Sequence, residues 1–229
     1  MFLYLLLLVP AMILPTLAQI LVKSAFAKYS KVRNSNNITG AKTAALLLAA
    51  NKITDVKIAA VSGSLTDYYA PGEKMIALSE PVCNVNSIAA VGVAAHESGH
   101  AIQYATRYKM LSGRNAIRKI STYGSRFGPY VAVAGAAISF TPLLYGGIAL
   151  FSVAVLFSFL TLPVEFNASS RALAALRDNN VLTKEELKGA KKVLSACALT
   201  YVASALTNFL TLIQLILKAN SKQKKVVRK

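Results

Sequence analysis

Hydrophobic residues gather in a few long stretches of this chain that are free of charge. Residues 1–22, 127–164 and 193–217 contain no Asp, Glu, Lys or Arg. A helix needs about 20 apolar residues to cross a bilayer, so each stretch is long enough for a membrane span. The middle stretch is nearly long enough for two spans. Its Thr141-Pro142 and Gly146-Gly147 pairs near the centre predict a helical hairpin that turns there.

The first stretch is predicted to be a retained membrane anchor. It has no basic residues ahead of its apolar run, and it reaches Lys23 without the small-residue pattern of a signal-peptide cleavage site. Hydrophobic residues make up 55% of the chain, a high share for a soluble domain. The pattern therefore predicts a mostly α-helical, multi-pass membrane protein.

Residues 24–125 have a more mixed pattern, which predicts a small α+β part. Thr39 precedes the apolar run 40–50, as expected of a capped helix. Residues 56–61 predict a strand, and 67–71 and 75–79 predict two strands of a hairpin around a Gly-containing turn. We expect the last of these strands to form an open sheet edge that can pair with an extended peptide. An ordinary core strand is the alternative.

Positive charge is concentrated outside the apolar stretches. The chain has 26 Lys and Arg against 9 Asp and Glu, a net charge of +17. The positive-inside rule places residues 23–126 and 165–192 in the cytoplasm, with the N-terminus outside. A full crossing by 193–217 would put the basic tail 218–229 outside, against this rule. The sequence therefore does not decide on which side of the membrane the tail lies. Basic residues flank apolar spans and do not interleave with exposed aromatics, which argues against a nucleic-acid partner.

The predicted order of segments follows from these two patterns. It comprises a transmembrane anchor (1–22), a cytoplasmic α+β part (23–126), a transmembrane helical hairpin (127–164), cytoplasmic helices (165–192), a C-terminal hydrophobic helix (193–217) and a basic tail (218–229).

The two histidines of the chain carry its most specific chemical signal. His96 and His100 are four positions apart, and Glu97 directly follows the first of them. The apolar run 88–95 before them predicts a helix, on which residues four apart share one face. Two imidazoles placed in this way can bind one zinc ion, with Glu97 beside the metal to transfer a proton. The alternative is a pair of surface histidines without a metal.

A catalytic zinc usually has three protein ligands and a water, so the two histidines need a third partner. The extended motif of the metzincins would require Gly at 103 and His at 106, where this chain has Gln103 and Thr106. The third ligand is then expected to be a carboxylate. The candidates are Asp67, Glu73, Glu80, Glu165, Asp178, Glu185 and Glu186.

Glu165 stands out among these carboxylates because it directly follows the 127–164 stretch. A carboxylate among apolar residues at a membrane edge is costly without a partner, and a cation is the obvious one. Pro163 suits the first turn of a new helix that would display Glu165. The alternative is an ordinary acidic residue at a helix start.

Several sequence runs resemble the YugP-like neutral zinc metallopeptidases of bacteria, which are relatives of the HtpX and CAAX-prenyl endopeptidase group of gluzincins. The matching runs are 28–33, 63–67, 93–103, 161–168 and 198–203. The resemblance implies a membrane metalloprotease with one zinc ion held by His96, His100 and Glu165, and with Glu97 as the catalytic base. The HtpX group also places a helical hairpin between the HExxH helix and the Glu-bearing helix.

One departure from this group concerns the support of a histidine ligand. The relatives carry an Asp four residues after the ligand Glu, where this chain has Ser169. The partner that orients a histidine is therefore expected to be weaker, or to come from elsewhere, with Asn167 and Asp67 as candidates.

The function predicted from the sequence is that of a zinc metalloendopeptidase in a bacterial cell membrane, with its active site facing the cytoplasm. It would hydrolyse peptides or membrane-associated proteins with a zinc-activated water. Arg171 and Tyr201 are candidate donors of a hydrogen bond to the oxyanion. The alternative for Arg171 is a basic residue that faces lipid headgroups, and the alternative for Tyr201 is packing at the membrane interface. Two competing functions are a non-catalytic membrane scaffold with a structural or vestigial metal site, and a zinc hydrolase acting on lipids or other amides.

Overall fold

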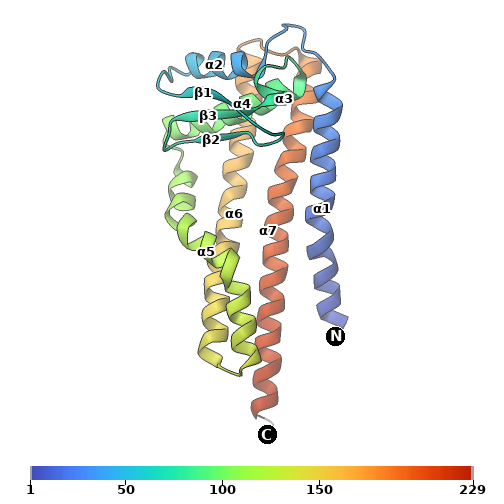
Figure 1. Ribbon diagram of the computed structural model, residues 1–229, viewed down its shortest axis with the longest axis vertical. Helices are drawn as coiled ribbons and strands as arrows, with labels where there is room; N and C mark the ends of the chain where they lie inside the picture. Colours follow the sequence, from blue (N-terminus) through green and yellow to red (C-terminus); the bar gives the residue numbers. More distant parts are fainter. Residues whose placement is uncertain (1, 228–229) are drawn as a thin grey trace. The chain divides into compact units, whose positions relative to one another are not determined.

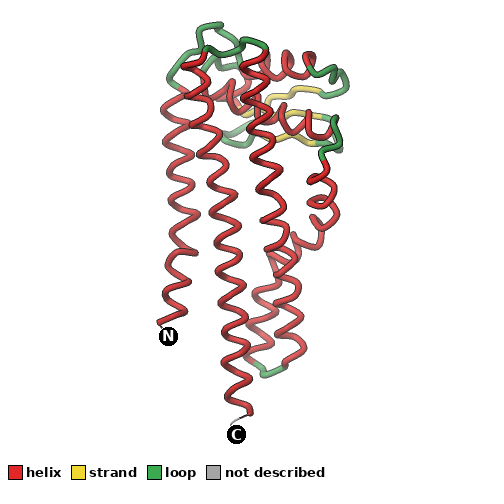
Figure 2. The backbone as a smooth tube through the Cα atoms, turned by 180° about the vertical axis from the view of Figure 1, so that it is seen from behind, coloured by secondary structure: helices red, strands yellow, loops and turns green. Residues whose placement is uncertain are grey.

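The computed structural model describes residues 2–227, and the side chains of residues 7–221. It is mostly helical with one small sheet (Figures 1 and 2), which confirms the predicted fold class. In chain order the elements are α1 (Phe2–Ser30), α2 (Gly40–Ala50), β1 (Lys57–Val61), β2 (Tyr68–Ala70), β3 (Met75–Ser79), α3 (Glu80–Cys83), α4 (Ile88–Ala105), α5 (Lys109–Ala137), α6 (Thr141–Asp178) and α7 (Lys184–Val227). Arg228 and Lys229 of the predicted basic tail lie outside the described residues.

The chain divides into two compact units. The first, here called the sheet unit, comprises residues 19–111 and 164–199. The second, the hairpin unit, comprises residues 1–18, 112–163 and 200–229. Helices α1, α5, α6 and α7 each contain residues of both units.

Three helices in the described part of the chain are long and apolar enough to cross a membrane. Their spans are Leu7–Ser30, Thr141–Asp178 and Lys184–Ser221. Helix α5, which carries basic residues such as Arg114, Arg118 and Arg126, is not among them. The sidedness of each segment stays a prediction.

Helices α5 and α6 form a helical hairpin, but its turn lies at residues 138–140. Thr141-Pro142 begins α6, where a proline in the first turn is well tolerated. Gly147 lies inside α6, so its expected place in the turn is wrong. A Cβ on Gly147 would lie 2.3 Å from the backbone nitrogen of Ala132 on α5. The glycine instead lets the two helices approach closely, as small residues do between membrane helices.

The sheet has the order β1-β3-β2, with β3 parallel to β1 and antiparallel to β2. The predicted hairpin of the second and third strands is confirmed. The expectation that Met75–Ser79 forms an open edge is wrong, because this strand is the central one. Its residues 76–79 are all buried, as expected of a strand that is paired on both sides and covered by helices.

Helix α4 is held within the core of the sheet unit. Thr39 caps α2 as predicted, since its hydroxyl oxygen accepts a hydrogen bond from the Lys42 N–H at 3.3 Å. Helix α2 packs on α4, and α4 also contacts β2 and β3. Buried alanines along α4, including Ala90 and Ala94, allow this close packing. The helix that carries the two histidines is therefore fixed along most of its length.

Candidate metal centre

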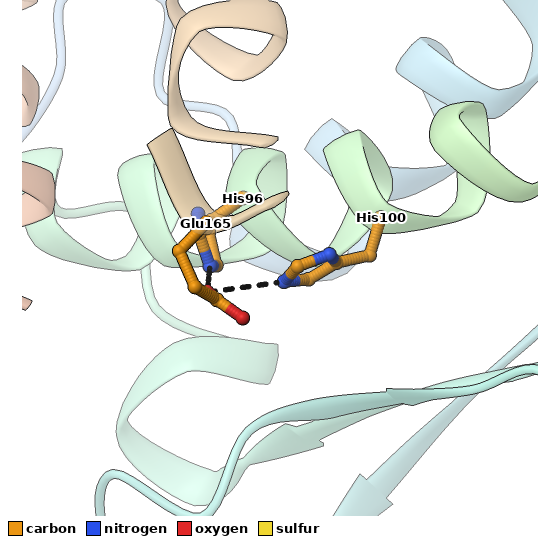
Figure 3. A group of neighbouring side chains, drawn as sticks. All are labelled: His96, His100 and Glu165. Carbon is orange, nitrogen blue, oxygen red and sulfur yellow. Dashed lines mark ion pairs between the residues drawn. The ribbon is translucent and has the colours of Figure 1, made fainter. Parts of the chain in front are cut away.

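His96 and His100 of α4 and Glu165 of α6 point toward one another (Figure 3). The Oε2 atom of Glu165 lies 3.4 Å from Nε2 of His96 and 3.5 Å from Nε2 of His100. Ligand atoms at ordinary zinc distances in a tetrahedral site are about 3.3–3.5 Å apart. The Glu165 oxygen is thus spaced from each imidazole nitrogen as in a shared tetrahedral site, and the three ligand atoms all lie within 4.8 Å of one another.

The surroundings of Glu165 fit a cation as well. Its side chain is only 4% exposed, and Oε2 has no hydrogen-bond partner among the described residues. A buried carboxylate oxygen without a partner is costly, and a bound cation removes that cost. Two imidazole nitrogens and one carboxylate oxygen form a donor set typical of catalytic zinc, with a fourth position left for water. The residues present therefore fit a zinc ion.

The other ring nitrogen of each histidine is also engaged. His100 Nδ1 lies 3.0 Å from Oε1 of Gln103, and His96 Nδ1 lies 3.2 Å from the hydroxyl of Ser169. Because an amide oxygen only accepts, we assign the proton of neutral His100 to Nδ1, which leaves Nε2 with a lone pair for a metal. Ser169 thus makes the histidine contact that the sequence led us to seek in Asn167 or Asp67.

Gln103 connects the two helices that carry the ligands. It is fully buried, and its Nε2 donates to the Val164 carbonyl at 2.8 Å and to Oδ1 of Asn167 at 2.9 Å. Sequence reasoning gave Gln103 no such role. A signal was available, because Gln103 follows His100 by three positions and so lies on the same helix face.

Replacing Gln103 with Leu is expected to lower zinc affinity about 10–100-fold, the usual cost of losing a partner that orients a ligand. Competition with a chromophoric chelator measures this affinity. The control is Thr106→Val, since among the described residues the Thr106 hydroxyl bonds to backbone carbonyls of its own helix. Equal zinc affinity in wild type and Gln103→Leu would contradict the orienting role.

Glu97 is buried beside these groups, with 7% of its surface exposed. Burial raises its pKa, and the charges of Asp67 and Glu165 add to this, while the two histidines oppose it. Burial lowers the pKa of His100, but the Glu165 and Glu97 carboxylates outweigh burial and raise it above its usual value. A buried carboxyl with a raised pKa is suited to accept a proton at neutral pH.

The other acidic candidates for the third ligand have different surroundings. Asp67 accepts hydrogen bonds from the N–H and hydroxyl of Ser79, and burial raises its pKa. Asp178 forms an ion pair with Arg177, and Glu185 forms one with Lys188. Glu186 accepts hydrogen bonds from the backbone N–H groups of Ser35 and Thr183. Glu73 and Glu80 are exposed. Glu165 is the carboxylate that joins the histidines in the described part of the chain.

Helix α6 runs through Pro163 without a break, so the expectation that Pro163 begins a new helix is wrong. Continuing the helix keeps its backbone groups hydrogen-bonded in apolar surroundings.

The two candidate oxyanion donors have different settings. Arg171 donates from Nε to Asn167 Oδ1 at 2.8 Å, and its guanidinium lies over the Tyr108 ring. Tyr201 belongs to the hairpin unit and is 37% exposed. Both roles stay predictions.

Gly99 lies between the two histidines and sets the spacing of α4 and α6. A Cβ at this position would lie 2.5 Å from the carbonyl oxygen of Ala168, three residues beyond Glu165. The two backbones are therefore in contact here, and this contact keeps Glu165 within reach of both imidazoles.

Replacing Gly99 with Ala is expected to push α4 and α6 apart. We expect a loss of about 1–3 kcal/mol in the free energy of unfolding, as for other overpacked sites, together with weaker zinc binding. Thermal unfolding and zinc titration of the purified protein measure the two effects. Gly113→Ala is the matched control, because a Cβ at Gly113 meets nothing within 4 Å. Equal stability of the two variants would contradict this account.

Comparison with known proteins identifies the family of this chain. Residues 4–220 match the family described as "Putative neutral zinc metallopeptidase". The chain is 44% identical over 200 residues to the "Putative membrane protease YugP" of Bacillus subtilis (strain 168), an alignment that covers 87% of this chain and 89% of that protein. No solved structure matches the chain. The family match includes all three residues of the candidate metal centre.

Proposed function

This chain belongs to the neutral zinc metallopeptidase family, and we propose that it is a membrane-embedded zinc endopeptidase of the gluzincin type. The observation that carries this proposal is the buried Glu165 Oε2, which has no hydrogen-bond partner among the described residues and lies within 3.5 Å of both imidazole Nε2 atoms. The family name supports zinc as the metal, and the apolar helices support a membrane protein.

His96, His100 and Glu165 would hold one zinc ion. When bound, zinc supplies a Lewis acid that makes water nucleophilic near neutral pH. Glu97 accepts the proton of the attacking water and later donates it to the leaving amine. Gln103 and Ser169 hold the imidazoles in the orientation that presents Nε2.

The substrates proposed are peptides or membrane proteins near the inner leaflet. The distribution of Lys and Arg supports a site that faces the cytoplasm. Arg171 reaches Asn167 of the Gln103 network, so it is the better supported of the two candidate oxyanion donors. In that role the Arg171 guanidinium would break its hydrogen bond with Asn167 when substrate binds.

Metal removal tests the proposal directly. We expect the purified protein to hold one zinc ion per chain and to hydrolyse casein. A chelator should abolish hydrolysis, and added zinc should restore it, because the attacking water needs a Lewis acid. Metal analysis and casein hydrolysis are measured on the same preparation. Bound zinc without hydrolysis would instead support a structural site, although such sites typically have four protein ligands.

A further inference from the structure

A groove of about 650 Å³ lies between α1 and α7 within the sheet unit. Figure 1 shows the C-terminal end of α1 beside the N-terminal end of α7. The groove is lined by residues between 21 and 29 of α1 and between 188 and 199 of α7. We call it the α1–α7 groove.

The two ends of the α1–α7 groove differ in chemistry. Leu21 and Leu199 line one end and are 50% and 45% exposed. Lys28 follows Leu21 by seven residues on α1, about 10 Å along the helix, and Lys191 and Lys192 precede Leu199 on α7. Because the two helices run in opposite directions, their lysines gather at one end of the groove and their leucines at the other.

The positive charge at the lysine end is largely uncompensated. None of the residues that line the groove, all of them described, is acidic. Lys188 pairs with Glu185 at 2.8 Å and so adds little net charge. Lys191 and Lys192 are exposed and form no ion pair with a described residue. Lys191 also lines an adjoining groove between α6 and α7.

We propose that the α1–α7 groove binds one anionic phospholipid. The phosphate lies at Lys28, Lys191 and Lys192, and an acyl chain lies along the apolar end. Both walls belong to helices that are long and apolar enough to cross a membrane. A phospholipid is the ligand whose charge meets the lysines while its chain covers the exposed leucines. An acidic peptide would satisfy the lysines and leave the leucines uncovered.

Native mass spectrometry of the full chain in neutral detergent tests the site. The protein is titrated with phosphatidylglycerol in a constant background of phosphatidylcholine. We expect one phosphatidylglycerol per chain at saturation. The double variant Lys191→Gln/Lys192→Gln should raise the titration midpoint about tenfold or more. This follows from the usual contribution of each lysine to the free energy of binding an anionic lipid. The control Lys42→Gln/Lys57→Gln removes the same charge from exposed positions outside the groove and should leave the midpoint unchanged.

A second variant separates the groove from general charge attraction. Ser195 lines the groove and is exposed, so Ser195→Trp fills the acyl position without changing charge. It should also raise the midpoint. The proposal fails if phosphatidylglycerol shows no one-to-one binding above phosphatidylcholine, or if both lysine pairs weaken binding equally. It also fails if Ser195→Trp has no effect, or if a polyglutamate peptide binds through Lys191 and Lys192 while phosphatidylglycerol does not.

Discussion

Replacing Glu97 with Gln is expected to lower the rate of peptide hydrolysis by about 10²–10⁴-fold, the usual contribution of a general acid–base group. The amide has the size of the carboxylate but cannot accept the proton of the attacking water. Zinc should stay bound, because Glu97 is not among the three clustered donor residues. Casein hydrolysis and zinc content, measured on the same samples, separate loss of catalysis from loss of metal.

The matched control for Glu97→Gln is Glu73→Gln, the same chemical change at an exposed residue of the β2–β3 turn. Its hydrolysis rate and zinc content should equal those of the wild type. If Glu97→Gln keeps its activity, Glu97 is not the base. If the variant loses zinc together with activity, Glu97 supports the metal and the proton transfer must be assigned elsewhere.

The parts of this site that are close in sequence could be predicted from spacing alone. The helix period places His96 and His100 on one face and Glu97 beside them. Glu165 could be predicted because a carboxylate that follows a long uncharged stretch needs a partner. The structure places Glu165 beside the histidines although it follows His100 by 65 residues, and its role as a metal ligand stays a prediction.

The parts that depend on packing between distant segments could not be predicted. The parallel pairing of β1 with β3 puts Met75–Ser79 in the middle of the sheet, and no local pattern distinguishes that strand from an edge. The contact of Gly99 with the Ala168 carbonyl depends on how α4 approaches α6. The bonds of Gln103 to Val164 and Asn167 on α6 depend on the same approach, whereas its contact with His100 could be predicted from their spacing.

Replacing Glu165 with Gln is expected to lower zinc affinity by at least about 100-fold, more than the loss of a residue that only orients a ligand. The amide keeps the size of the side chain and removes the charge that attracts the cation. The wild type should gain about 2.7 kcal/mol of stability at a free zinc concentration 100 times its dissociation constant. The variant should gain only about 0.4 kcal/mol or less at the same concentration. Thermal unfolding with and without zinc measures the difference.

The zinc-free samples decide between a metal ligand and a structural ion pair. If Glu165 serves to pair with protonated histidines, removing its charge should destabilise the zinc-free protein by about 3–5 kcal/mol. If it is a metal ligand, the zinc-free variant should unfold close to the wild type, because the cost of burying the carboxylate offsets its attraction to the imidazoles. Gln103→Leu provides the comparison, since it also weakens zinc binding but leaves Glu165 in place. A large loss of stability in zinc-free Glu165→Gln, with zinc affinity unchanged, would mean that the three side chains form an ion-pair cluster, and the metalloprotease proposal would lose its central observation.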